Sequence, residues 1–239
     1  MDSKSMEKGE KSMMSQVFSS PFFGVTLCIA TYEFGIWCNR KLKTPIANPL
    51  LIAIALVIVV LKIAHISLED FNQGGDVISM FLAPATACLA MSIYSQYEQL
   101  KANLLPILIG SAVGSAVSMG SVYGMCRLFC LDEKLTISML PKSVTTPIAM
   151  ELVSQNGGVV PVTVAAVVVT GIMGAMLAPF LIRLFGVHNP VAVGVAIGTC
   201  SHALGTTKAV ELGEIEGAMS GIAIGTAGLM TVLFSMLIS

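Results

Sequence analysis

Long apolar stretches separated by short polar connections run along the chain from residue 17 onward. A hydrocarbon layer about 30 Å thick is crossed by roughly 20 helical residues at about 1.5 Å each. Many stretches are apolar at every position, without the alternation of a barrel strand, so helices are expected throughout. The sequence predicts an all-α polytopic membrane protein with about 7–8 membrane segments, near residues 17–38, 49–66, 77–96, 104–131, 135–155, 159–185, 190–210 and 217–238.

The connections hold nearly all the charged residues and leave no room for a soluble domain. Residues 1–16 are predicted to be a polar N-terminal tail, without the pattern of a cleaved signal peptide, and residues 17–239 a single transmembrane domain. Composition agrees, because only 11% of the residues are charged, against about 25% in soluble domains. The net charge of −1 offers no field that would attract nucleic acid.

Two of the segments, 135–155 and 190–210, contain groups that a continuous lipid-facing helix excludes. The first contains Pro141, Lys142 and Pro147, and the second ends in a run of hydroxyl, histidine and lysine side chains. Each unpaired backbone group or charge costs kilocalories in hydrocarbon. Both segments are therefore predicted to be broken or re-entrant helices buried against protein or water.

A weak internal repeat is indicated by segment starts that recur at an offset of about 140 residues. The predicted repeats are 17–131 and 159–239, joined by the broken segment 135–155. If that segment crosses the membrane, the copies are inverted, as in many transporters; if it is re-entrant, they are parallel. The matching starts are Pro21 with Pro161, Asn48-Pro49 with Asn189-Pro190, and Gly74-Gly75-Asp76 with Gly213-Glu214.

The first broken segment contains a candidate anion site. Ser143, Thr145 or Thr146 is suited to cap a short helix whose first turn holds the following proline. The free amide N–H groups at the start of that helix, with Lys142 beside them, would attract an anion such as a carboxylate. The alternative is an interfacial turn whose lysine extends to lipid headgroups.

The second broken segment offers hydroxyls and titratable groups. Gly198 and Gly205 permit an unwound backbone, and His202 is suited to relay a proton near neutral pH. Alternatively, His202 is a hydrogen-bonded structural residue, and Lys208 with Glu211 is an ion pair at a helix end. The substrate-binding prediction is Lys142, Ser143, Thr145, Thr146, Ser201, His202, Gly205 and Thr206, and the proton-coupling prediction is His202, Glu211, Glu214 and Glu151.

Enzyme activity is not expected. Ser201 and His202 are adjacent, so on a helix their side chains point about 100° apart, and the chain has no G-x-S-x-G motif. His202 has no carboxylate or cysteine at metal-ligand spacing downstream. The six cysteines include no CxxC pair and are expected to be unpaired packing residues. We therefore predict no catalytic residue, metal or cofactor.

The two motifs resemble those of the LrgB/CidB membrane protein family. The resemblance runs from Phe81-Leu-Ala-Pro-Ala-Thr to the C-terminus and includes Pro141-Lys-Ser-Val-Thr-Thr-Pro-Ile-Ala-Met and Ser201-His-Ala-Leu-Gly-Thr-Thr-Lys-Ala. The chain differs at Ala203 and Leu204, where family members often have glycine and isoleucine.

The resemblance implies two functions. Bacterial members are described as antiholin-like regulators of murein hydrolase activity and cell lysis, paired with a small LrgA/CidA holin-like partner. Plastid relatives carry glycolate and glycerate, and some bacterial systems are linked to pyruvate. We expect a transporter of small carboxylates with proton coupling, or alternatively an antiholin-like regulator that associates through glycine-rich helix faces.

Three further expectations concern assembly and location. A homodimer is expected from the size of the chain, and the small-residue face Gly110, Gly114, Gly120 and Gly124 is expected to pack against other helices. The absence of a fused holin-like half and of a transit peptide favours a bacterial-type, multi-pass plasma-membrane protein.

Overall fold

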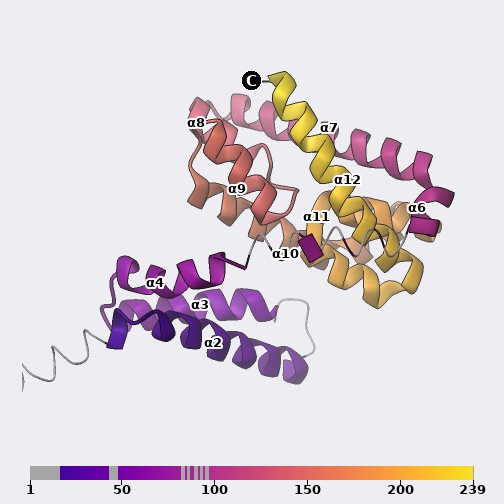
Figure 1. The fold of residues 1–239 in the computed structure, drawn as a ribbon. Helices are drawn as coiled ribbons and strands as arrows, with labels where there is room; N and C mark the ends of the chain where they lie inside the picture. The colour runs from indigo at the N-terminus through magenta and orange to yellow at the C-terminus, as the bar shows by residue number, and fades with distance from the viewer. Residues whose placement is uncertain are drawn as a thin grey trace, which may run out of the picture. The chain divides into compact units, whose positions relative to one another are not determined.

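The computed structural model describes residues 17–42, 48–81 and 97–238, with isolated positions between 84 and 94. All regular structure in these residues is helical, so the predicted all-α class is confirmed (Figure 1). The polar tail 1–16 and most of the segment predicted at 77–96 lie outside the described residues. The helices long and apolar enough to cross a membrane are α2 (Pro21–Leu42), α7 (Leu104–Leu128), α10 (Val160–Leu184) and α12 (Glu214–Ile238).

The chain divides into two compact units, with the boundary between Pro84 and Ala85. The first unit holds α2, the shorter apolar helix α3 (Pro49–Ile63) and the polar helix α4 (Leu68–Ser79). α4 lies where the sequence predicts a connection, because the hydropathy of this stretch is too low for a span. The start of α4 is stabilised by a local cap, because Ser67 Oγ accepts a hydrogen bond from the amide of Asp70 at 3.1 Å.

Helices α3 and α11 (Pro190–Leu212) begin with the same kind of cap, as expected if they are corresponding parts of the proposed repeat. The Oδ1 atoms of Asn48 and Asn189 each accept two amide hydrogen bonds from the first turn. Gly74 of the third match lies inside α4 and packs against Gly24 of α2, and most of the span predicted to follow it lies outside the described residues. The repeat itself stays a prediction.

In the second unit, α7 and α12 run side by side in the same direction (Figure 1). Ile107 and Met219 share a buried cluster, and farther along both helices Ser111 Oγ lies 2.8 Å from Thr226 Oγ1. Hydroxyls thus pair across the helix interface, where lipid offers them no partner.

The broken segment 135–155 is a helical hairpin. α8 (Glu133–Met139) and α9 (Thr146–Gln155) are joined by the turn 140–145. Ser138 Oγ near the end of α8 accepts a hydrogen bond from the amide of Val159 at 2.7 Å, so the start of α10 lies beside α8. The chain therefore enters and leaves the hairpin at one level.

The tip of this first hairpin reaches the middle of α7. Ser143 Oγ lies 2.7 Å from Ser118 Oγ, in the central part of α7. Asn156, directly after α9, lines the same cavity as Arg127 in the last turn of α7. Because Val159 after α9 lies beside Ser138 of α8, the segment between them turns back on itself, which is the re-entrant arrangement of the two alternatives that the sequence left open.

α11 is a second hairpin, folded at His202, whose φ of 41° and ψ of −141° are not helical. In a straight helix Val193 and Ala209 would be about 24 Å apart along the axis, yet both belong to one buried cluster. Val191 packs against the cluster of Ile107, near the start of α7. The second hairpin therefore enters from the end of the bundle opposite to the first.

Glycines bring α11 close to its neighbours. A Cβ added to Gly110 would lie 2.9 Å from Val195, and one added to Gly114 would lie 2.6 Å from Thr199. The packing prediction is confirmed for these two glycines. For Gly120 and Gly124 it stays a prediction, because α11 turns back before it reaches their level and no described atom lies within 4 Å of an added Cβ.

Candidate functional site

The tips of the two hairpins meet at Val167, in the first third of α10. Its side chain is fully buried in a cluster with Val144 and Ala149 of the first hairpin. Its carbonyl oxygen lies 2.9 Å from Nε2 of His202 in the second hairpin. The two interrupted segments that the sequence predicted therefore converge in the centre of the second unit.

The first tip presents a cation that no carboxylate of the described residues neutralises. Lys142 is half-buried, and its Nζ donates a hydrogen bond of 3.4 Å to Ser143 Oγ. None of the described carboxylates pairs with it. An ammonium group away from bulk water is costly without a counter-charge, so this position favours an anionic ligand.

The start of α9 adds partial positive charge to the same tip. Thr145 is the N-cap residue, as predicted, and Thr146 opens the helix, but the Thr145 side chain makes no cap hydrogen bond. Its hydroxyl and the first amide N–H groups are therefore available to a ligand.

The second tip is held by His202, which is 4% exposed. Because the carbonyl of Val167 can only accept, Nε2 of His202 carries the proton and Nδ1 is the nitrogen that titrates. Gly198 and Gly205 were expected to permit an unwound backbone, but the break falls at His202, and these glycines pack closely against Ser220 and Ile197.

Two predicted binding residues make close contacts within the protein. Thr206 Oγ1 donates to the carbonyl of His202 at 2.9 Å and lies 2.7 Å from Ser220 Oγ. Ser201 is buried against Gly174 of α10. These contacts fix the shape of the second hairpin, and Gly205 makes room for the two arms to approach.

The hydroxyl of Thr199, which was not among the predicted binding residues, also lies near the hairpin tips. Thr199 is 3% exposed, and its Oγ1 has no hydrogen-bond partner in the described part of the chain. Its neighbour Cys200 is within electrostatic range of Lys142, which links the two tips. Buried hydroxyls are almost always paired, so this one is suited to bind a ligand.

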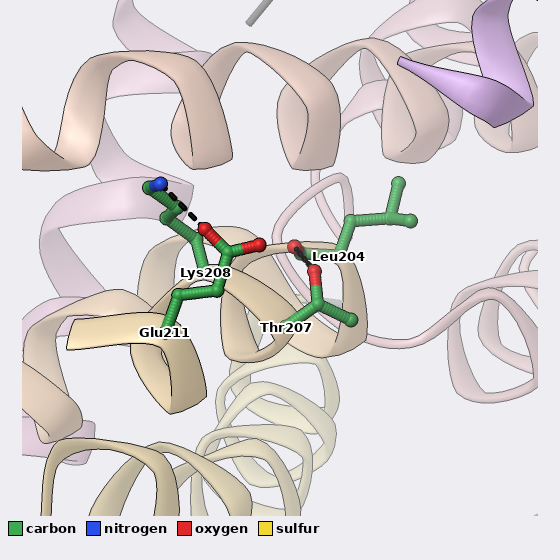
Figure 2. A network of polar contacts seen from close by, with 4 residues as sticks. All are labelled: Leu204, Thr207, Lys208 and Glu211. Carbon is green, nitrogen blue, oxygen red and sulfur yellow. Dashed lines mark hydrogen bonds and ion pairs between the residues drawn. The ribbon is translucent and has the colours of Figure 1, made fainter. Parts of the chain in front are cut away.

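The three acidic candidates lie away from the tips. Glu151, Glu211 and Glu214 are all exposed. Glu211 pairs with Lys208 at 2.6 Å, the helix-end ion pair that the sequence offered as the alternative (Figure 2). Beside it, Thr207 Oγ1 donates to the carbonyl of Leu204 at 2.7 Å. Of the proton-coupling candidates, His202 alone is buried at the tip.

The backbone at His202 gives a prediction about stability. His202→Ala should be less stable than His202→Gly by about 1 kcal/mol, because both lose the bond to Val167 but only glycine adopts a positive φ without strain. Thermal unfolding in detergent measures the difference. Equal melting temperatures for the two variants would show that the backbone at the break is unstrained.

Three crossing helices and two hairpins that enter from opposite ends define a polytopic membrane protein with a cationic, hydroxyl-lined centre. The sequence profile of the LrgB-like family matches residues 28–239, and the chain belongs to that family. It is a multi-pass protein of the bacterial membrane.

Two named relatives are similar in sequence to this chain over most of its length. The chain is 37% identical to the antiholin-like protein LrgB of Bacillus subtilis (strain 168), over 90% of this chain and 93% of the relative. It is 36% identical to the antiholin-like protein LrgB of Bacillus mycoides (strain KBAB4), over 90% of this chain and 94% of the relative. No solved structure matches.

Proposed function

We propose that this chain is an antiholin-like membrane protein that restrains cell lysis and murein hydrolase activity together with a small holin-like membrane partner. The identity of 37% over nearly the full length of a relative with that name supports the proposal. The relatives' names denote no enzymatic reaction, which agrees with the expectation of a non-enzyme.

A bacterial strain that lacks its own relative of this chain tests the proposal. Expression of the intact chain should lower the rate of autolysis and the murein hydrolase activity of the culture, and co-purification should recover the holin-like partner. Unchanged autolysis at confirmed membrane expression would contradict the regulatory function. The expected homodimer is tested separately, by cross-linking the purified chain in detergent.

Transport of small carboxylates is the second candidate, and it is favoured by the unneutralised Lys142 at the hairpin tips. Pyruvate, glycolate and glycerate carry one carboxylate and an adjacent oxygen. The carboxylate would bind Lys142 and the first turn of α9, and the adjacent oxygen would bind a hydroxyl such as Thr199. His202 would exchange a proton at Nδ1.

The two hairpins also give this candidate a means of alternating access. Each hairpin separates the central site from one end of the bundle, since one enters beside the end of α7 and the other beside its start. Movement of one tip at a time would expose the site to one side of the membrane and then to the other, as in transporters built around broken helices.

Thr199→Val separates ligand binding from folding. The substitution keeps the shape of the side chain and removes a hydroxyl that has no partner in the described structure, so stability should be unchanged or rise by up to about 1 kcal/mol. If the hydroxyl binds the solute, KM for carboxylate uptake into proteoliposomes should rise by roughly five- to tenfold. Unchanged uptake would remove Thr199 from the site.

A further inference from the structure

A cavity of about 440 Å³ lies beside the first hairpin, between α7, α8, α9 and α12. Polar side chains line it from α7, α8 and α12, among them Arg127, Thr136 and Thr231, and Asn156 lines it directly after α9. A polar cavity larger than a single water molecule is expected to hold water. The cavity is therefore expected to be a hydrated space within the second unit.

This space extends from the end of the bundle toward the hairpin tips. At the outer end it is lined by Arg127 in the last turn of α7 and by Glu133 in the first turn of α8. At the inner end it is lined by Leu140 and Pro141, and Pro141 directly precedes Lys142. The inner end of the cavity thus reaches Pro141, the residue next to Lys142 at the hairpin tip.

Arg127 is held in a fixed position at the outer end. Its Nε and Nη2 donate to the hydroxyl of Tyr123 at 3.1 and 2.9 Å, and the guanidinium lies 5.1 Å from the centre of the same ring. Nη1 makes no hydrogen bond with the described residues. The two N–H groups of Nη1 can donate to an anion, whereas the carboxylate of Glu133 repels anions.

We propose that this cavity is a vestibule that admits small organic anions to Lys142, with Arg127 as the residue that attracts them. The inference rests on the transport candidate above and adds its route of access from one side. Charge at the mouth of a narrow polar passage raises the local concentration of ions of opposite sign, so Arg127 should act on anion access and Glu133 should oppose it.

Cysteine labelling in proteoliposomes tests the vestibule. The full chain, with its six native cysteines replaced by alanine, carries either Leu140→Cys, which lines the cavity, or Val117→Cys, which is exposed on α7 outside it. Thr136→Cys replaces the first variant if it does not purify as a folded protein. Water-soluble anionic and cationic methanethiosulfonates of similar size are compared by their labelling rates.

We expect the cysteine at 140 to be labelled from water much faster than the one at 117. The ratio of anionic to cationic labelling should fall roughly three- to tenfold with Arg127→Gln and rise with Glu133→Gln. Arg183→Gln, in the last turn of α10, is the matched control and should leave the ratio unchanged. Equal labelling at 140 and 117, or a ratio insensitive to Arg127, would overturn the vestibule.

The labelling does not depend on transport, so the two proposals fail separately. If the native chain takes up no carboxylate but the labelling follows Arg127, the vestibule stands and the transport candidate falls. If the native chain takes up carboxylate and the labelling does not follow Arg127, transport stands and this route of access is wrong.

Discussion

Lys142→Ala is expected to abolish carboxylate uptake by proteoliposomes that contain the full chain. The ammonium group is the one positive charge that the described structure places at the hairpin tips, and a hydrogen bond to a charged group contributes about 1.5–3 kcal/mol. The loss of such a contact together with its charge corresponds to a fall of roughly 100-fold or more in kcat/KM. Initial rates of uptake of labelled pyruvate and glycolate measure it.

Lys208→Ala is the matched control. Lys208 also belongs to a conspicuous motif, but its Nζ pairs with Glu211 at a helix end, away from the tips. Removal of this ion pair should change stability by less than about 1 kcal/mol and leave uptake near that of the native chain. If Lys142→Ala transports normally, or if both variants lose uptake equally, the proposed binding centre is wrong.

The two interruptions could be predicted because their signals are local. Pro141, Lys142 and Pro147 within an apolar run, like the hydroxyls and His202 in the second run, are incompatible with an unbroken helix in lipid. The helix starts at Asn48 and Asn189 follow from cap chemistry in the same way.

The direction of each hairpin could not be predicted, because it depends on contacts between residues far apart in the chain. Ser138 with Val159, and Val193 with Ala209, decide that both segments turn back. The choice of His202 as the break likewise depends on the carbonyl of Val167, which compensates for a positive φ that the sequence would assign to glycine.

The role of Thr199 was hidden for a related reason. A lone threonine in an apolar helix normally bonds to the carbonyl of the preceding turn, so its presence in the sequence carries no signal. Its hydroxyl stands out only when packing against Gly114 and the lack of a partner among the described residues are both known. Helix α4 could not be recognised from long apolar runs, because its sequence contains none.

Gly198→Val is expected to disrupt the packing of α11 against α12. An added Cβ would meet the backbone carbonyl of Ser220 and lie 2.9 Å from Cβ of Ala223. A backbone contact cannot move aside as a flexible side chain can, so overpacking should cost about 3 kcal/mol. In a chain of this size the melting temperature in detergent should fall by roughly 6–12 °C.

Gly120→Val provides the comparison, because both glycines lie within helices but no described atom lies within 4 Å of an added Cβ at Gly120. Since valine has a better helix propensity than glycine, this variant should be as stable as the native chain.

The disturbed packing in Gly198→Val should also affect the hairpin tips, because Ser220 is hydrogen-bonded to Thr206, which in turn donates to the carbonyl of His202. Uptake should therefore fall in Gly198→Val even at temperatures where the variant is folded. Equal stability of the two variants would show that the second hairpin does not need its close contact with α12.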